Sequence, residues 1–388
     1  MNILYYNWTE YAGEDLMKSF LNLGFVYTKI MYPITDYNRD SKFDDFIDSV
    51  IKNNNFDVIF TFDFFPLISK AAQRNGLPYI AWIFDNPHYT LFSDTLFNSC
   101  NRIFFFDKDE LQFFTSRGLK NGYHVPLPVN VNRLDSLLGN SISSTSYDYT
   151  ISFIGQLYSG NLYDRVNYLP QYIKGFLDGI IAAQSNVYGY NFVSEVLSHD
   201  WISKISEYIR LTPDEDSPLP LNNVFSNMIN AKITNLDRCN SLYSLSKYYP
   251  VDLFTKEEPG PDSIPENLHI HGPVSYTDEM PYIFRHTKIN LNISLRSITS
   301  GIPLRAMDIM GAGGFLLSNY QNELAEYFEI NKELALYDSQ TSLLELADYY
   351  IHHDEERCMI AERGYKKIKD NFTHDILIPE VLRLSGIM

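Results

Sequence analysis

The chain has 388 residues and carries 48 Asp and Glu against 31 Lys and Arg, which gives it a formal net charge of −17. This acidic balance argues against a protein that binds nucleic acid polymers, because clustered Lys and Arg hold phosphate backbones. Charged residues make up 20% of the chain and hydrophobic residues 45%, a composition that excludes disorder of the whole chain. The length suggests two domains.

Apolar, β-rich runs alternate with amphipathic stretches through the first third of the chain, which is the pattern of βαβ units around a parallel sheet. These runs predict a first domain whose last strand is short. Its prolines cannot donate hydrogen bonds to a neighbouring strand on both sides, so we expect it at the edge of the sheet. The expected strands are 1–6, 56–62, 79–84, 102–106 and 124–128, and the expected helices are 13–23, 66–74 and one capped by Asp107.

The composition turns to Ser, Thr and Asn at 140–146, which is typical of a linker between domains. A strand at 149–154 follows, then a mainly helical stretch at about 162–246, and the βα rhythm resumes afterwards. The resumed strands are expected at 251–255, 268–271, 288–293 and 314–317.

We therefore predict an α/β protein with two Rossmann-like domains facing a cleft and a helical insert in the second domain. The expected division is 1–145 for the N-terminal domain and 146–369 for the C-terminal domain, with the insert at about 162–246. Residues 370–388 are expected to include a helix that crosses back to the first domain.

The stretch from 267 to 319 is the most informative part of the sequence. It reads as two strands whose carboxyl ends are polar, followed by a polar loop that leads into a helix. In open α/β sheets, ligands bind beyond the carboxyl ends of the strands, where helix N-termini favour anions. The candidate binding residues at these ends are His271, Gly272, Pro273, Asn292, Arg296, Ser300 and Gly301.

Two arginines and one acid give this stretch its chemistry. Arg296 and Arg305 would supply charge-assisted hydrogen bonds to a diphosphate. Asp308 lies one helical turn after Arg305, where it could accept hydrogen bonds from two ribose hydroxyls. A surface ion pair between Arg305 and Asp308 explains the same spacing equally well. Earlier in this domain, Gly155-Gln156 forms the first strand-to-loop turn, where a glycine lets the backbone approach a phosphate.

The segment from Asp308 to Asn319, DIMGAGGFLLSN, resembles the E-A-x-A-x-G-x-P-V-V-A-S segment of GT-B glycosyltransferases of the group 1 type. The resemblance implies that the acid at 308 binds the ribose of a nucleotide-sugar. Asp308 replaces the usual Glu, and the family's other acid would fall at Ser300, so that half of its E-x7-E pattern is absent.

A closer resemblance is to the CgeB-like, spore-maturation branch of that family. It rests on 289–294, Leu304-Arg305 and Gly313-Gly314. In the first domain, the segments 62–94, 103–114 and 123–130 resemble the uncharacterised domain that precedes the CgeB-like glycosyltransferase domain in many bacterial proteins. Together the two resemblances cover nearly the whole chain.

In the first domain, the strand at 79–84 runs into Asp85-Asn86-Pro87-His88. Asp85 and His88 could deprotonate an acceptor hydroxyl or hydrogen-bond the donor sugar. The alternative is a turn in which Asp85 caps backbone N–H groups and His88 lies at the surface. Glu14 is a rival base, although a carboxylate at a helix N-terminus has an ordinary stabilising role.

No metal or other cofactor is expected. The D-x-D sequences Asp107-Lys-Asp109 and Asp214-Glu-Asp216 are interpreted as a helix cap and a proline-flanked loop rather than as metal ligands. Cys100, Cys239 and Cys358 lie too far apart in sequence for a zinc pattern. A GT-B site neutralises the leaving diphosphate with helix dipoles and cationic side chains instead.

The hypothesis from the sequence is a metal-independent glycosyltransferase of hexosyltransferase type, in which the second domain binds a nucleotide-sugar, by family analogy a UDP-sugar. The first domain would bind a hydroxyl acceptor on a protein or a cell-surface glycan. A nucleotide-sugar epimerase of the same fold and a non-catalytic binding protein remain open alternatives. No run of about 18 apolar residues occurs, so a cytoplasmic protein without an integral membrane segment is expected. The sequence does not indicate the oligomeric state.

Overall fold

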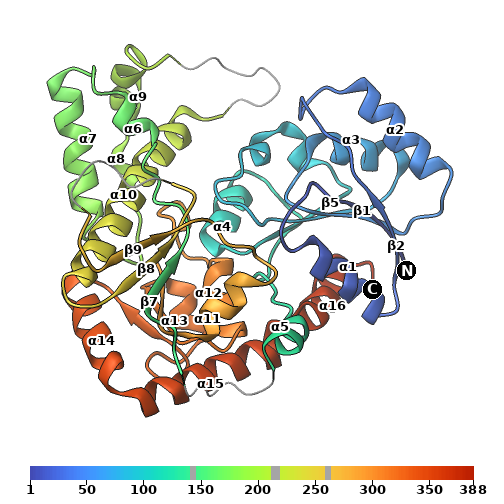
Figure 1. The fold of residues 1–388 in the computed structure, drawn as a ribbon. Coiled ribbons are helices and arrows are strands. Elements are labelled where there is room, and N and C mark those ends of the chain that lie inside the picture. The colour runs from blue at the N-terminus through green and yellow to red at the C-terminus, as the bar shows by residue number, and fades with distance from the viewer. Residues whose placement is uncertain (140–145, 211–218, 258–263) are drawn as a thin grey trace. The chain divides into compact units, whose positions relative to one another are not determined.

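The computed structural model describes residues 1–139, 146–210, 219–257 and 264–388. The chain forms two compact units, each built on a six-stranded sheet (Figure 1). The first unit contains Met1–Pro128 and Phe372–Met388, and the second contains Val129–Leu211 and Leu221–Asn371. The predicted linker at 140–146 falls almost entirely outside the described residues, as does the loop that holds Asp214 and Asp216.

The sheet of the first unit is parallel throughout and has the strand order β2-β1-β3-β4-β5-β6. Its central strands are apolar on both sides, as in sheets that helices cover on both faces. The strands are β1 (Asn2–Tyr6), β2 (Val26–Ile30), β3 (Val58–Phe62), β4 (Tyr79–Trp82), β5 (Asn101–Phe105) and β6 (Gly122–His124).

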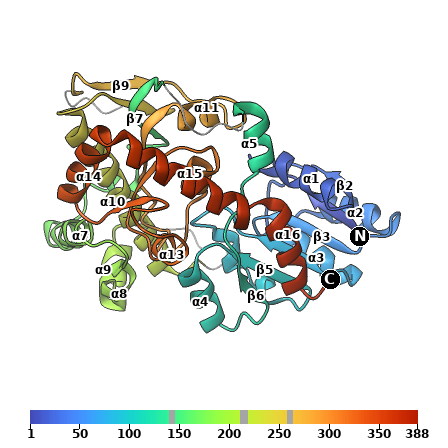
Figure 2. The same cartoon turned by 90° about the horizontal axis from the view of Figure 1, so that it is seen from below.

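Helices cover the two faces of this sheet. On one face the core joins the sheet to α2, α3 and α4. On the other face Phe20 of α1 packs against Tyr5 and Phe60, and α16 lies beside α1 in both views (Figures 1 and 2). The helices are α1 (Gly13–Asn22), α2 (Ser41–Lys52), α3 (Pro66–Asn75), α4 (Lys108–Ser116) and α16 (His374–Leu384), with 3-10 turns at Tyr89–Phe92 and Asp94–Phe97.

The second unit has a parallel sheet in the order β12-β11-β10-β7-β8-β9. The chain builds outward from β7 to β9 and then returns to the other side of β7, so the strand order reverses between β7 and β10. The strands are β7 (Tyr149–Ile154), β8 (Val251–Phe254), β9 (Leu268–His271), β10 (Thr287–Asn292), β11 (Leu316–Asn319) and β12 (Ala335–Tyr337).

The insert between β7 and β8 is helical and has its own apolar core, to which α10 contributes Phe225, Ile229 and Ile233. Further along, the same long helix joins the core of the sheet through Leu242 and Leu245. The helices of this unit are α5 (Val131–Leu138), α6 (Leu162–Arg165), α7 (Gln171–Gln184), α8 (Val193–Val196), α9 (His199–Ser206), α10 (Leu221–Ser246), α11 (Glu279–Arg285), α12 (Leu304–Gly311), α13 (Asn322–Tyr327), α14 (Gln340–His352) and α15 (Asp354–Asn371).

The predicted fold class is confirmed: the chain has two Rossmann-like units with a helical insert in the second. One predicted strand was misplaced. The strand expected at 124–128 is Gly122–His124, because Pro126 and Pro128 have no N–H to continue the ladder after Val125 bonds to Phe105. The edge position predicted for this strand is correct. None of the described helices is long and apolar enough to cross a membrane.

Candidate functional site

The reversal of strand order between β7 and β10 marks the place in this fold type where ligands bind. A buried arginine of α10, Arg238, lies there. Its Nε and Nη2 donate to the carbonyl of Ile293, at 3.1 and 2.7 Å, and its Nη1 donates to the carbonyl of Gln156. One guanidinium therefore joins the two backbone segments that follow β10 and β7.

The guanidinium of Arg238 is buried, which disfavours its charged form. Burial lowers the pKa of Arg238 to about 10, and the nearby charge of Arg305 adds to this lowering, whereas Tyr158 and Glu257 oppose it. The guanidinium remains charged at neutral pH. An anion placed here would gain more from this charge than it would from an exposed arginine, because the local dielectric is low.

The turn after β7 leaves little room for a side chain at Gly155. A Cβ at Gly155 would lie 3.2 Å from the ring of Phe153, so a side chain there would crowd the strand. The following loop is held by Glu257, whose carboxylate accepts the N–H groups of Tyr158 and Ser159 at 3.1 and 2.9 Å. Gln156, the predicted neighbour of Gly155 in the site, is exposed.

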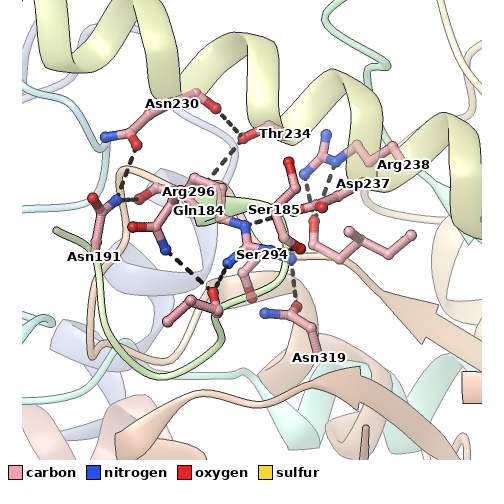
Figure 3. Close-up of polar contacts among 12 residues, drawn as sticks. Gln184, Ser185, Asn191, Asn230, Thr234, Asp237, Arg238, Ser294, Arg296 and Asn319 are labelled. Carbon is pink, nitrogen blue, oxygen red and sulfur yellow. Dashed lines mark hydrogen bonds and ion pairs between the residues drawn. The ribbon is translucent and has the colours of Figure 1, made fainter. Parts of the chain in front are cut away.

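Arg296 lies in a buried polar network rather than on an open loop (Figure 3). Its Nε pairs with Asp237 of α10 at 2.5 Å, and its Nη1 donates to the carbonyl of Val187 at 2.6 Å. The backbone of the same residue donates to Thr234 and accepts from Asn191. This side chain is thus engaged within the protein, and it fixes the loop after β10 to the helical insert.

Arg296 and Asp237 form a buried pair, in which burial raises the pKa of Asp237 against the opposing charge of Arg296. Burial acts to lower the pKa of Arg296, but contact with the Asp237 carboxylate raises it overall. The two side chains are 9% and 6% exposed. The sequence predicted that Arg296 binds a diphosphate. In the structure its charge is instead balanced by the carboxylate of Asp237, which lies 59 residues earlier in the sequence.

Arg305 and Asp308 lie on α12, which begins after the loop that Arg296 anchors. Arg305 is half-buried, with its guanidinium 5.7 Å from the centre of the Phe284 ring and its Nη1 near the sulfur of Met280. Asp308 is buried and accepts a hydrogen bond from the hydroxyl of Tyr276 at 3.2 Å. The helix α12 therefore carries both a cation, Arg305, whose charge lies near that of Arg238, and a fixed carboxylate, Asp308.

Ser300 has an acid beside it. Its hydroxyl donates to the carboxylate of Glu323 at 2.9 Å, and its carbonyl accepts the N–H of Glu323 at 3.0 Å. Glu323 belongs to α13 and is 1% exposed. The carboxylate that the sequence pattern lacks at position 300 is thus present in space from another helix. In the sequence this acid is a single Glu in the first turn of the helix after β11, and no spacing rule identified it.

The remaining predicted donor-site residues divide into exposed and buried ones. His271 is partly exposed, stacks on Phe254 and bonds Asp252 at 2.8 Å. Asn292 is buried, and its amide donates to Ser294 and Ser318. Gly272 and Pro273 are exposed, Gly301 is buried, and Gly313 has a φ of 78°, which explains a glycine there.

In the first unit, Asp63 organises the turns that follow β3 and β4. It is 2% exposed, has a φ of 61°, and accepts the N–H groups of Phe84 and Asp85 at 2.8 and 3.0 Å. The ring of His88 accepts the N–H of Phe64 at Nε2, while its Nδ1 lies 3.9 Å from Asp63. His88 is thus held among backbone groups and is mostly buried.

Asp85 has the more available side chain of the predicted pair. It reaches the surface, and its pKa is raised to about 6, first by loss of hydration and then by the charge of Asp63, against the opposing effect of His88. A carboxylate with this pKa is ionised at neutral pH and is a stronger base than an ordinary aspartate. Glu14 is exposed in the first turn of α1, the position expected for its stabilising role.

Glu10 is a buried acid that the sequence did not point to. Its carboxylate accepts from Tyr5, from Asn7 at 2.7 Å and from the N–H of Trp8 at 2.9 Å. Burial raises the pKa of Glu10 to about 7. A Cβ at Gly13 would collide with this carboxylate and with the side chains of Asn7 and Tyr5, so a larger residue there would displace them. Glu10 shapes the loop after β1.

The described ranges contain no group of three or more His, Cys, Asp or Glu side chains able to hold a metal ion. The interpretation of Asp107 as a helix cap is confirmed, because its carboxylate accepts the N–H groups of Asp109 and Glu110. The second D-x-D, at Asp214 and Asp216, lies outside the described residues.

Comparison with known proteins agrees with this architecture. Residues 243–382 match the family model described as glycosyl transferase-like. No curated protein sequence matches the chain significantly. Among solved structures, a sucrose-phosphate synthase from Thermosynechococcus elongatus aligns with a TM-score of 0.54 at 7% identity, covering 99% of this chain and 98% of its own.

Two further structures align over nearly their whole lengths. HepE from Anabaena, in complex with UDP-glucose, has a TM-score of 0.54 at 9% identity and covers 100% of both chains. A UDP-forming alpha,alpha-trehalose-phosphate synthase from Burkholderia xenovorans has a TM-score of 0.53 at 10% identity, covering 99% of this chain and 98% of its own. The chain therefore has the GT-B fold of glycosyltransferases, and much of its second unit matches the glycosyl transferase-like family.

Proposed function

We propose that the protein is a glycosyltransferase that moves a sugar from a UDP-sugar to a hydroxyl acceptor. The observation that carries the proposal is the paired positive charge of Arg238 and Arg305 at the reversal of strand order in the second unit. Negative charge develops on the departing diphosphate during sugar transfer, and fixed cations in a site of low dielectric stabilise it. The match of residues 243–382 and the likeness to HepE with UDP-glucose support this assignment.

Each group of the second unit has a role in this proposal. Arg305 binds the diphosphate, and the nearby positive charge of Arg238 adds to the attraction. Asp308 accepts the ribose hydroxyls while Tyr276 orients its carboxylate. Glu323, held by Ser300, supplies the acid that would contact the sugar ring. Arg296 positions the loop that leads to α12 and does not contact the diphosphate.

The first unit would bind the acceptor, a hydroxyl of a protein or a glycan. Asp85 is the group we assign to accept the proton of that hydroxyl, because it is exposed and its pKa lies near 6. The proposed reaction uses cationic side chains rather than a metal ion to neutralise the diphosphate. The finer resemblance to the CgeB-like branch stays a prediction.

Replacing Arg305 tests the proposal. We expect Arg305→Ala to weaken UDP binding at least about tenfold, as loss of a charge-assisted hydrogen bond implies, and to abolish sugar transfer while the fold is retained. Isothermal titration with UDP and release of UDP from UDP-sugars in the presence of an acceptor panel give the two readouts.

The matched control is Arg363→Ala, an exposed arginine of α15 in the same unit. It removes the same charge from the chain and is expected to leave both readouts unchanged. Undiminished UDP binding and turnover in Arg305→Ala would refute the assignment, as would equal losses in the two variants.

A further inference from the structure

A narrow, basic pocket lies in the second unit at the amino ends of β10 and β11. The candidate donor site lies at the opposite, carboxyl ends of these strands. The pocket is partly open to solvent, and its polar lining comes from Tyr147, Arg285, Thr287, Lys288, Arg357 and Cys358. Three of these six side chains are cationic, in a chain whose net charge is −17.

Arg357 is the feature that points to a ligand. It is 1% exposed and lies in the first turn of α15. Its Nη1 donates to the carbonyl of Tyr350 at 2.8 Å and to Asp354 at 2.5 Å. Its Nη2 is buried and makes no hydrogen bond of good geometry in the described part of the chain, although the Tyr147 ring lies beside the guanidinium, with its centre 4.9 Å from Cζ. A buried charged donor without an acceptor is costly, so an anion that reaches it is favoured.

The carboxylate of Asp354 shows how such an anion would be held. Its Oδ1 bonds both Arg357 and, at 3.3 Å, the Nζ of Lys288, so one oxygen already bridges two of the cations. The hydrogen bond from Arg357 keeps the pKa of Asp354 low, and its side chain is 61% exposed. An exposed carboxylate can swing away when a ligand competes for the same cations.

We propose that this pocket binds a small phosphate-class oxyanion. Arg357 would donate through Nη2 and Lys288 through Nζ, while the phenol of Tyr147, which bonds Cys358 at 3.3 Å, lines the wall. The narrowness of the pocket favours inorganic phosphate or a single phosphate group over a nucleotide. Asp354 is then the internal competitor of the ligand. The pocket adds an anion site that is separate from the proposed donor site.

Titration with inorganic phosphate at constant ionic strength tests the proposal. Binding to the whole chain is expected to be saturable by calorimetry. Lys288→Gln should weaken it about tenfold, the loss expected for one charge-assisted hydrogen bond. Asp354→Asn should tighten binding, because it removes the competing charge. The matched control is Lys366→Gln, which removes a lysine of α15 that lies outside the pocket and should leave the affinity unchanged.

All titrations are repeated in the Arg305→Ala background, so that phosphate bound at the donor site is recognised. Binding at the pocket should persist there with the same order of affinities among the variants. The proposal is overturned if phosphate does not bind saturably, if Lys288→Gln and Lys366→Gln bind it equally, or if Arg305→Ala alone removes the binding. Circular dichroism confirms that each variant is folded.

Discussion

Arg238 and Arg296 differ in what surrounds their guanidinium groups, and on this difference we base the proposed binding role of Arg238 and the structural role of Arg296. Arg296 faces the carboxylate of Asp237. Arg238, the next residue of α10 after Asp237, donates mainly to two backbone carbonyls, which neutralise no formal charge. If a diphosphate binds here as we propose, it should be attracted more by Arg238 than by Arg296, whose charge Asp237 already balances.

The structural role of the Arg296 pair leads to a prediction about stability. Asp237→Asn would leave a buried guanidinium without its counter-charge, and removal of one partner of a buried pair costs about 3–5 kcal/mol. Urea unfolding should show a loss of this size. Asp370→Asn, which breaks the exposed pair with Lys366, should cost about 0.5 kcal/mol or less. Similar losses in both variants would contradict the structural role.

The pKa of Asp85 leads to a prediction about pH. A general base acts when it is ionised, so with a pKa of about 6 the value of kcat/KM should fall about tenfold per pH unit below pH 6 and level off above it. The Asp85→Asn variant should be strongly impaired and lose this acid limb. Glu14→Gln is the control and should retain it. An unchanged acid limb in Asp85→Asn would exclude Asp85 as the base.

At the residue scale, the sequence predicted which residues follow the strand ends but not the contacts of each side chain. Arg296 lies in the loop after β10, as predicted from the strand pattern, yet its partner Asp237 comes from the distant insert, and no local spacing encodes that pairing. Arg238 was missed because it lies inside a helix rather than in a loop motif. Its signal was an arginine on the buried face of α10, in register with Thr234 and Asn230.

At the scale of elements, α10 links the insert to the site. Thr234 and Asp237 of this helix contact Arg296 in the loop after β10, and Asn230 bonds Asn191, whose amide donates to the carbonyl of Arg296, as Figure 3 shows. The backbone of that loop is thus supported by side chains of a helix that belongs to the insert. Removal of the insert would therefore release the loop that leads into α12.

Close packing of α15 gives a prediction at this scale. A Cβ at Gly364 would lie 2.4 Å from the backbone carbonyl oxygen of Glu333, so Gly364→Ala must displace main chain. We expect a loss of about 1–3 kcal/mol. Gly179→Ala, in α7 with nothing within 4 Å of the added carbon, should instead stabilise the chain by about 0.5–1 kcal/mol. Thermal unfolding of both variants checks the opposite signs.

Which elements could be predicted follows from their burial. The central strands β3, β4 and β7 are apolar runs and were found within two residues of their ends. The edge strand β2 was not predicted, because its first four side chains are exposed or half-buried and two of them, Thr28 and Lys29, are polar. The short strand β12 was missed as well, since three residues carry too little periodicity to distinguish a strand from a turn.

At the scale of the whole molecule, the acidic balance and the anion sites are compatible because charge is distributed locally. Long-range attraction of polyanions is opposed by the net charge of −17, whereas a single diphosphate responds to the few cations within about 10 Å of it. The βα alternation was sufficient to predict two Rossmann-like units. It could not predict which side chains converge at the end of each sheet, since that depends on contacts between distant segments.

The first unit is completed by α16, which comes from the other end of the chain. Its buried side chains Leu377, Ile378, Val381 and Leu382 belong to the same compact unit as residues 1–128, and they lie against α1. During synthesis these residues leave the ribosome after the entire second unit. The N-terminal sheet therefore keeps one apolar face incompletely covered until α16 has left the ribosome exit tunnel. A chaperone or a nascent-chain protease would encounter that face during the interval.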